Sequence, residues 1–395
     1  MREYRFISDR LRFRNRVVTV TVAVSYLVMI VAVAVSSGFR GEIRSGLSRM
    51  SGDIQITPPN QSVLDVSKPI EKSPFYISKV EATDGVKDVV PVVYRAGIVK
   101  AGQTIHGVMF KGLPEGAEEL ASASDSVALA VAIPRRLSEI TGLKTDDKMM
   151  SYFIGEKTRL RQFNIVSMYD AMVQPDDMLV VYTRLADLQR LEGWTDEQVS
   201  SIEIHLDDKV WDDHRVEELT DEVSGLIYEY SRTSESPVIA ESSRTRYSQI
   251  FDWLDLIDFN VFFIFVLMTL VAGFNMMSGM LIMLFENRAT IGVFKALGMR
   301  NRSIFRVFLT KASGFLLKSM LIGNVVALAF CLIQDQTHIL GLNPENYFVS
   351  FVPVSVDIAA ILVADVISYL AIMLILLLSI FFISKVDPAQ TVKMK

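Results

Sequence analysis

The chain has 395 residues, 50% of them hydrophobic and 22% charged, with a mean hydropathy of +0.33. This balance excludes an ordinary soluble enzyme and a protein lying wholly in lipid, and it predicts apolar spans joined to a soluble domain. The net charge of −5 argues against nucleic acid as a partner, and the single cysteine, Cys331, excludes an intrachain disulfide.

Four apolar segments are long enough to be transmembrane α-helices. The segment 17–37 carries no charge over about 21 residues, or about 32 Å of helix, which is enough to cross a bilayer. The other three segments are 257–285, 303–334 and 357–384. Residues 32–34 resemble a signal-peptide cleavage site, but the apolar run exceeds a usual signal sequence, so we expect an uncleaved span.

Positive charge predicts the orientation of the spans. Six arginines lie in the amphipathic N-terminal segment 1–16, and four Lys or Arg residues lie in the loop 286–302. The tail 385–395 holds three lysines, whereas the loop 335–356 has neither Lys nor Arg. By the positive-inside rule, both termini and the 286–302 loop are cytoplasmic, and residues 38–250 lie outside.

The region 38–250 alternates strand and helix signals, which is typical of an α+β domain. Strands are expected at 53–57, 86–93, 163–168, 178–182 and 201–206, with a hairpin of 98–99 and 105–110 around Gly102. Helices are expected at 75–82, from Pro134 to 140, and at 210–230, whereas 58–74 and 232–246 are polar connections.

No catalytic, metal or cofactor site is predicted in this chain. The four histidines are scattered, without the close spacing of a helical zinc pair, and His205 is interpreted as an ordinary strand residue. The sequence has neither a GxSxG elbow nor a GxxxxGKS or GxxxxGKT phosphate loop. If the process needs ATP and Mg²⁺, another subunit must bind them.

The loop between the second and third spans predicts a short amphipathic helix that ends at Gly298. Its apolar face is formed by Ile291, Val293, Phe294 and Leu297. Small residues that let another surface approach closely are Ala289, Gly292 and Ala296. Such a helix either lies on lipid headgroups or docks into the groove of a partner protein.

The fourth span contains one acid, Asp365, at a depth similar to that of Asn324 in the third span. A buried acid in a membrane is costly unless it is paired, so we expect a structural hydrogen bond between these two side chains. A proton-linked role of Asp365 is the alternative.

The run 286–298 resembles the coupling segment of the FtsX/MacB-type ABC permeases, which carry a similar E-x-R-x-x-I-G-x-x-(K/R)-A-L-G pattern. Further segments resemble the LolC and LolE lipoprotein-release permeases, in order along the whole chain: Ser37-Gly38-Phe39, 52–56, 85–91, 347–354 and Asp387-Pro388-Ala389.

The resemblance implies a MacB-like α+β porter core interrupted by a second subdomain at about 100–200. It also implies two permease chains, as a homodimer or heterodimer, working with a separate LolD-like ATPase. Such complexes extract lipoproteins from the outer leaflet of the bacterial inner membrane and pass them to a periplasmic LolA-like carrier. The residues carried over for ATPase coupling are Glu286, Arg288, Ala289, Thr290, Ile291, Gly292, Phe294, Lys295, Ala296, Leu297 and Gly298.

A released lipoprotein needs an apolar surface for its acyl chains, and the outer halves of the first two spans are the candidate walls. The residues expected there are Met29, Val33, Phe39, Phe259, Phe262, Phe263 and Val266. Lipid-facing or helix-packing positions are the alternative for each of them.

LolC-type chains carry a proline-containing hook that grips the carrier, whereas the corresponding stretch here, 154–162, is short and lacks proline. Lys157, Arg159 and Arg161 are candidate carrier-facing residues, with a solvated hairpin tip as the alternative. Two other functions share this architecture, MacB-like export and FtsX-like regulation of a cell-wall hydrolase. The large outer domain disfavours the regulator, and the short N-terminal segment disfavours an exporter with a fused ATPase.

Overall fold

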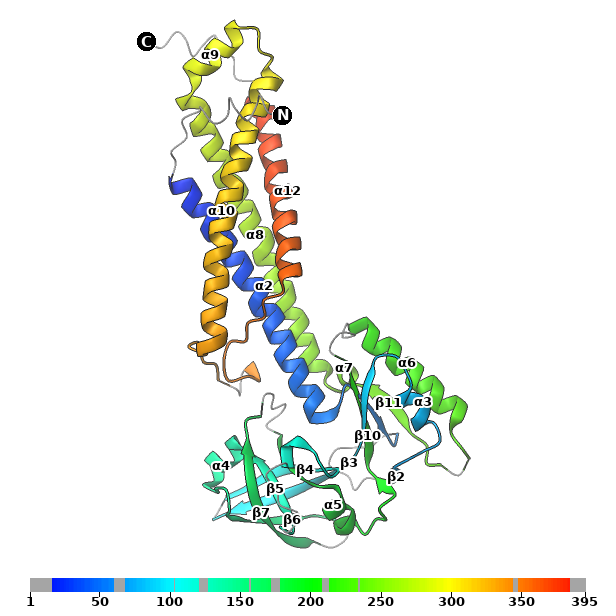
Figure 1. Cartoon of the computed structure of the whole chain (residues 1–395). Helices are drawn as coiled ribbons and strands as arrows, with labels where there is room; N and C mark the ends of the chain where they lie inside the picture. The colour runs from blue at the N-terminus through cyan, green and yellow to red at the C-terminus, as the bar shows by residue number, and fades with distance from the viewer. Residues whose placement is uncertain are drawn as a thin grey trace. The chain divides into compact units, whose positions relative to one another are not determined.

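The computed structural model describes residues 16–59, 68–102, 104–120, 127–155, 158–171, 178–207, 213–233, 235–343 and 347–383. The chain divides into two compact units (Figure 1). One unit contains most of the long apolar helices, and the other consists of residues 42–253 together with 342–350. The Asp387-Pro388-Ala389 motif, most N-terminal arginines and the lysines of the tail lie outside the described residues.

Four helices in the described part of the chain are long and apolar enough to cross a membrane, which confirms the predicted class. They are α2 (Arg16–Ser51), α8 (Ser248–Glu286), α10 (Asn301–Thr337) and α12 (Ile358–Ile383). The first three extend beyond the expected spans because hydropathy marks only an apolar stretch, not the whole helix. After residue 37, α2 continues with a buried stripe at helical spacing, formed by Ile43, Leu47 and Met50.

The helical unit packs closely where small residues face neighbouring helices. A side chain at Gly323 of α10 would place its Cβ 2.5 Å from the carbonyl oxygen of Ala23 and 2.7 Å from the Cβ of Tyr26, both on α2. At Gly273 of α8, the same atom would lie 2.5 Å from a methyl carbon of Ile375 on α12. Glycines at these positions therefore permit the close helix contacts that are typical of membrane bundles.

The connection between α10 and α12 is held against the bundle by hydrogen bonds. The buried Gln334 side chain donates to the carbonyl oxygen of Val352 at 3.1 Å and accepts from the backbone N–H of Leu340 at 3.1 Å. A Cβ on Gly38 of α2 would lie 2.4 Å from the carbonyl oxygen of Pro353. Two of the segments that resemble the lipoprotein-release permeases, around residues 38 and 353, are therefore in direct contact.

The second unit is built on a nine-stranded sheet in the order β11-β1-β10-β3-β4-β8-β5-β7-β6. The strands are β1 (Ile54–Thr57), β3 (Val86–Ala101), β4 (Thr104–Leu113), β5 (Ala130–Pro134), β6 (Lys148–Phe153), β7 (Arg159–Tyr169), β8 (Leu179–Arg184), β10 (Ser201–Leu206) and β11 (Ile239–Ser242). A separate two-stranded sheet pairs β2 (Ile70–Glu71) with β9 (Gln198–Val199).

Strand β6 also pairs with β3, so the six strands β3, β4, β8, β5, β7 and β6 close into a barrel. Phe110, Phe153 and Phe163 are buried in the core of this unit, with ring centroids 4.9 to 6.1 Å apart. The N-terminal half of β3 instead pairs with β10, so this one long strand belongs to both parts of the sheet.

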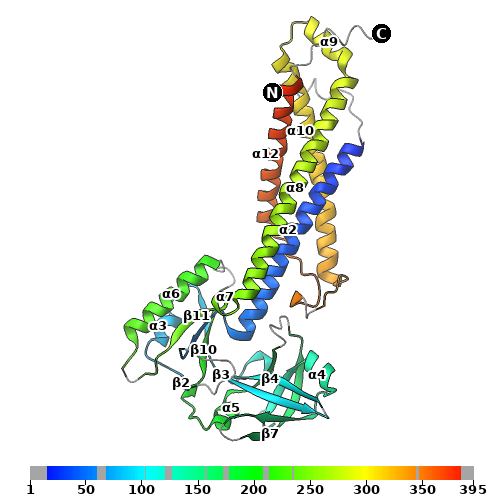
Figure 2. The same ribbon diagram turned by 180° about the vertical axis from the view of Figure 1, so that it is seen from behind.

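The helices of this unit are α3 (Ile77–Glu81), α4 (Arg135–Thr141), α5 (Leu185–Glu192), α6 (Asp213–Tyr230) and α7 (Ser243–Arg246), with a short 3-10 helix at Glu118–Leu120. Figures 1 and 2 show α6 beside α3 and β11. The buried face of α6 is formed by Val216, Leu219, Val223 and Ile227.

The predicted strands at 53–57, 86–93, 163–168, 178–182 and 201–206 are confirmed, as are the helix after Pro134 and the hairpin at Gly102. The structure corrects the polar connection expected at 232–246, which contains β11 and α7. Strand β11 forms there because its backbone pairs with β1, a long-range contact that cannot be predicted from its four-residue sequence.

Candidate functional site

The loop between α8 and α10 folds into the helix α9 (Arg288–Ala296). Three backbone hydrogen bonds of 3.0 Å close its end: the N–H groups of Leu297, Gly298 and Met299 donate to the carbonyl oxygens of Val293, Lys295 and Phe294, respectively. Gly298 adopts a φ of +82°, which residues other than glycine rarely tolerate. The predicted helix and its stop at Gly298 are confirmed.

The apolar face expected on α9 is divided between two sides of the helix. Ile291 and Phe294 are partly buried and pack against the helical unit, whereas Val293 and Leu297 are 57% and 79% exposed. Residues two apart on a helix differ by about 160° in direction, so Val293 must point away from Ile291. The expectation of one continuous face is wrong for this reason.

The exposed side of α9 combines Val293 and Leu297 with three small, exposed residues, Ala289, Gly292 and Ala296. We call these five residues the α9 face. Of the other candidate coupling residues, Glu286, Arg288 and Lys295 are exposed and Thr290 is half-buried. The surface that can receive a partner is therefore small and apolar, with charged residues around it.

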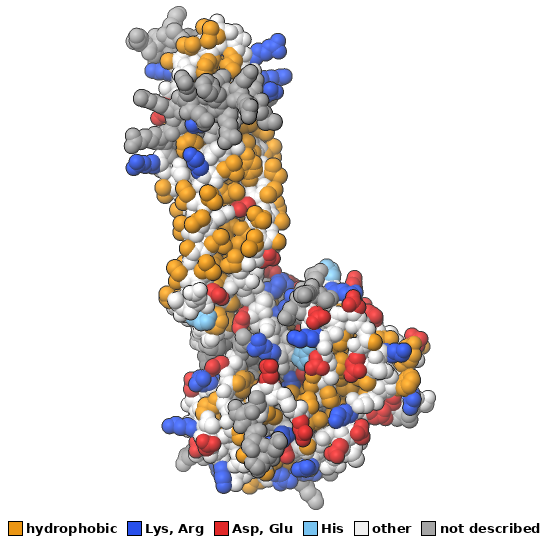
Figure 3. Space-filling view, viewed as in Figure 1, with side chains coloured by type: hydrophobic (Ala, Val, Ile, Leu, Met, Phe, Trp, Pro, Cys, Tyr) orange, Lys and Arg blue, Asp and Glu red, His pale blue; other side chains and the backbone are white. Residues whose placement is uncertain are grey.

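The candidate acyl-chain residues of α8 lie together on one exposed side of that helix. Phe259, Phe262, Phe263 and Val266 have the spacing i, i+3, i+4 and i+7, and all four are exposed. We call them the phenylalanine stripe. Hydrophobic side chains cover much of the visible surface of the long helices in Figure 3.

The three candidates from α2 do not share this exposure. Val33 is half-buried, whereas Met29 and Phe39 are buried inside the described chain. Met29 faces α8, where its sulfur lies 3.9 Å from the Thr269 hydroxyl oxygen. Met29 and Phe39 are therefore covered by neighbouring side chains within the described chain, and their part in an acyl-chain cavity stays a prediction.

A polar cluster that sequence reasoning missed lies just before the phenylalanine stripe. The guanidinium of Arg40 donates to Asp258 and, at 2.8 Å, to Asp255 of α8. The Ser36 hydroxyl donates to the other oxygen of Asp258. The cluster ties α2 to α8 where the long apolar run of α8 begins. Its sequence signal was the single acid, Asp258, that interrupts the second apolar segment.

Asn324 and Asp365 are in contact, as their similar depth predicted. The Asn324 side-chain nitrogen donates to Asp365 Oδ2 at 2.5 Å. On the next turn of α12, the buried Ser368 hydroxyl lies 3.2 Å from the hydroxyl oxygen of Tyr26 on α2. The pair and its neighbours thus place polar groups from three helices inside the bundle.

The candidate carrier-facing residues lie on the hairpin of β6 and β7. Arg159 and Arg161 of β7 are exposed, as are the apolar neighbours Ile154 and Leu160. Lys157 lies outside the described residues. The described residues on either side of the hairpin loop are thus a mixture of basic and apolar side chains.

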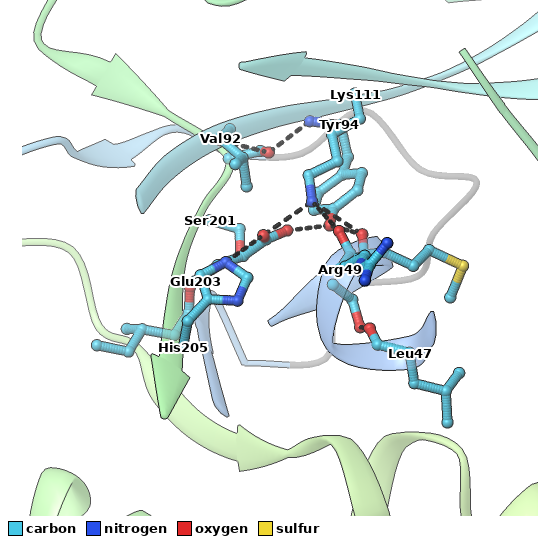
Figure 4. A network of polar contacts seen from close by, with 12 residues as sticks. Leu47, Arg49, Val92, Tyr94, Lys111, Ser201, Glu203 and His205 are labelled. Carbon is cyan, nitrogen blue, oxygen red and sulfur yellow. Dashed lines mark hydrogen bonds and ion pairs between the residues drawn. The ribbon is translucent and has the colours of Figure 1, made fainter. Parts of the chain in front are cut away.

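A buried ion pair, also missed by sequence reasoning, lies at the end of α2 (Figure 4). Lys111 of β4 and Glu203 of β10 have side chains only 2% and 1% exposed, with Nζ and Oε2 2.8 Å apart. The Lys111 ammonium also donates to carbonyl oxygens in the last turn of α2, those of Met50 at 2.9 Å and Arg49 at 3.2 Å. A positive charge at a helix C-terminus is favourable because the helix dipole is negative there.

The Tyr94 hydroxyl completes this site. It contacts the Glu203 carboxylate and lies 3.0 Å from the carbonyl oxygen of Met50. Burial and the charge of Glu203 raise the pKa of Tyr94 well above its ordinary value. Burial alone would raise the pKa of Glu203 as well, but Lys111 and His205 beside it hold that pKa below its ordinary value.

The chain passes from this helix end to the sheet through only two residues. Gly52 has a φ of +73°, and its N–H donates to the carbonyl oxygen of Ser48 at 2.7 Å. Asp53 then accepts from the N–H of Leu206 at 2.8 Å before β1 begins at Ile54. We call Lys111, Glu203 and Tyr94, with these two residues, the α2 joint.

Within the described residues, no group of three or more His, Cys, Asp or Glu side chains is placed to hold a metal ion. His205 contacts Glu203, with Nε2 3.6 Å from Oε2, and lies in β10 as a strand residue. The prominent polar sites are therefore contacts between structural elements.

Comparison with known proteins gives a family match for part of the chain. Residues 262–388 match the family described as FtsX-like permease C-terminal. The chain is also 22% identical over 351 residues to the lipoprotein-releasing system transmembrane protein LolC of Neisseria meningitidis serogroup B. That alignment covers 82% of this chain and 80% of the relative.

Two solved structures are similar to part of the chain. The periplasmic region of MacB from Actinobacillus actinomycetemcomitans is 14% identical, with a TM-score of 0.33, and covers 51% of this chain and 95% of its own. The extracellular domain of the ABC-type transporter YknZ from Gram-positive bacteria is 12% identical, with a TM-score of 0.31. The match covers 48% of this chain and 99% of the YknZ domain. The chain is thus similar to FtsX-like permeases over residues 262–388, a stretch that includes most of α8 and all of α9, α10 and α12.

Proposed function

We propose that this chain is the permease subunit of an ABC-type complex that extracts lipoproteins from the outer leaflet of the bacterial inner membrane. The observation that carries the proposal is the alignment with LolC, because it covers 82% of the chain and so includes the sheet domain as well as the helices. In this proposal, residues 38–250 are periplasmic and pass the lipoprotein to a soluble periplasmic carrier.

The energy source in this proposal is a separate ATPase subunit that binds ATP and Mg²⁺. Its docking site is the α9 face, where Val293 and Leu297 are exposed beside Ala289, Gly292 and Ala296. Partly buried Ile291 and Phe294 hold α9 to the helical unit, so a push on the exposed side is transmitted to the spans. The permease chain itself carries out no chemistry.

The acyl chains need an apolar path because exposing them to water costs about 0.8 kcal/mol per CH₂. The phenylalanine stripe supplies such a surface on α8. A second permease chain, identical or different, would close the other side of the cavity.

The α2 joint supports a further part of the proposal, in which movement of α2 is passed to the sheet that faces the carrier. The basic hairpin tip at Arg159 and Arg161 is the proposed contact with an acidic surface of that carrier.

Photocrosslinking tests the cavity directly. A photoreactive residue at Phe262 should capture acylated lipoprotein in cells, whereas the same residue at Val363, an exposed apolar position near the start of α12, should capture phospholipid. Capture of phospholipid alone at both positions would assign the phenylalanine stripe to ordinary lipid contact.

The two rival functions differ in what accompanies the purified complex. Lipoprotein release predicts an acylated protein, MacB-like export predicts a membrane-fusion adaptor, and FtsX-like regulation predicts a cell-wall hydrolase. Depletion of the chain should leave lipoproteins in the inner membrane if the first function is correct.

A further inference from the structure

The contact between α10 and α12 leaves two buried oxygens without a hydrogen-bond donor. Asn324 donates to Asp365 Oδ2 at 2.5 Å, but Asn324 Oδ1 and Asp365 Oδ1 are buried without a partner in the described part of the chain. Buried acceptors are normally paired, and a membrane offers no water to replace the missing donor. At least one further hydrogen-bond donor is therefore expected beside these two oxygens.

The neighbouring polar side chains do not supply it. The Ser368 hydroxyl is directed to Tyr26 of α2 and to the backbone carbonyl oxygen of Asp365. Lys318, on the same helix as Asn324, is exposed, and no ion pair between Asp365 and a Lys, Arg or His is found among the described residues. Tyr26 is thus the titratable side chain that approaches from α2, and Asn324 is the group that faces the acid from α10.

We propose that Asp365 is protonated in the membrane and that its O–H donates to Asn324 Oδ1. Together with the bond from the Asn324 nitrogen to Asp365 Oδ2, this closes a neutral ring of two hydrogen bonds between α10 and α12. A single proton, on Asp365 Oδ1, turns one unpaired acceptor into a donor and gives the other its partner. The ionised form would keep both acceptors unpaired. It would also place a full charge among apolar helices, because Asp365 is only 4% exposed within the chain.

The ring stabilises the contact between α10 and α12. Because it needs the proton, ionisation of Asp365 removes one of its two hydrogen bonds and adds a charge, which weakens the attachment of α12 to α10. Asn in place of Asp365 keeps a neutral side chain that can pair with Asn324, whereas a leucine in place of Asn324 removes both bonds. This inference concerns the helical unit and does not depend on the transported substrate.

Infrared spectroscopy of the full-length protein in lipid nanodiscs tests the proposal. At neutral pH, the wild type should show the carbonyl band of a protonated carboxylic acid, and Asp365→Asn should lack it. Asp357→Asn is the matched control, because Asp357 precedes the same helix, is exposed and accepts from the N–H groups of Ala359 and Ala360. The control should keep the band.

A second variant distinguishes pairing from protonation alone. In Asn324→Leu, the band of Asp365 should move to higher wavenumber or disappear, because the carbonyl loses its amide donor. Absence of the band in folded wild type at neutral pH would overturn the proposal, as would a band that persists in Asp365→Asn. A band that neither moves nor weakens in Asn324→Leu would overturn the ring.

Discussion

At the scale of single residues, the buried ion pair of the α2 joint has the largest expected effect on stability. Lys111→Met leaves the Glu203 carboxylate buried without its cation, and we expect a loss of about 3–5 kcal/mol in the free energy of unfolding. Arg95→Met is the matched control, because Arg95 Nε lies 3.0 Å from Oε1 of Glu192 in a second buried pair of the same unit.

Both variants should destabilise the sheet domain in denaturant unfolding of the detergent-solubilised chain. Only Lys111→Met should also uncouple ATP hydrolysis from substrate release, because Lys111, unlike Arg95, contacts the end of α2. Equal uncoupling in the two variants would show that general stability, and not the joint, matters for transport.

The charge of Glu203 also predicts a pH dependence. Its pKa is lowered in the folded chain. The ionised carboxylate therefore contributes to the free energy of unfolding above the unfolded-state pKa of about 4.3, and this contribution is lost as pH falls through the lower folded-state pKa. Acidification below about pH 4.3 should therefore destabilise the wild type more steeply than Glu203→Gln. Thermal unfolding at a series of acidic pH values measures how steeply the stability of each protein falls. Equal slopes for the wild type and Glu203→Gln would contradict the lowered pKa of Glu203.

At the scale of secondary-structure elements, α9 is the part whose function can be separated from its folding. Val293→Glu on the α9 face should weaken ATPase binding at least tenfold, a change of about 1.4 kcal/mol, because it places a charge at the centre of an apolar contact. Lys318→Gln is the control, since Lys318 is exposed on α10 and is not one of the candidate coupling residues. Co-purification of the ATPase measures the effect, and equal loss in both variants would count against docking on this face.

Close packing of α10 against α2 gives a second prediction at this scale. Gly323→Ala should destabilise the helical unit by about 1–3 kcal/mol, because the new methyl group meets the Ala23 carbonyl oxygen. Gly314→Ala, on the same helix with open space around it, should be neutral or stabilising. Thermal unfolding in detergent compares the two, and similar stabilities would show that the bundle adjusts at Gly323.

The elements that the sequence predicted best were those with a strong local pattern. The four long helices follow from apolar length, and β10 follows from the alternation in residues 201–206. The closed barrel could not be foreseen, because it depends on the pairing of Ile98 with Tyr152 across a long stretch of chain. The joint could not be foreseen either, since Lys111 and Glu203 look like ordinary strand residues until the fold brings them together.

The exposure of the candidate site residues could be predicted only where helical spacing decides it, and their role stays a prediction. The phenylalanine stripe has that spacing on a single helix, and all of its members are exposed. The burial of Met29 and Phe39 could not be foreseen, because exposure on α2 depends on which neighbouring helices cover it. On α9, hydrophobicity marked the right residues, but which of them face the bundle depends on the geometry of the connection to α8 and α10.

At the scale of the whole molecule, the chain combines two parts with different physical requirements. The helices offer apolar surface to a membrane, while the sheet domain keeps its charges paired inside, as at Lys111 and Glu203. A lipoprotein has the same division, because its acyl chains belong in lipid and its polypeptide in water. This correspondence supports release as the proposed function of the full assembly.

The most direct test of that function is a release assay in vesicles that contain the chain, its ATPase and a radiolabelled lipoprotein. We predict that ATP transfers the lipoprotein to a soluble carrier in the supernatant, and that Val293→Glu abolishes the transfer while Lys318→Gln preserves it. Lipoprotein that remains in the vesicles with ATP, carrier and an assembled wild-type complex all present would contradict the account.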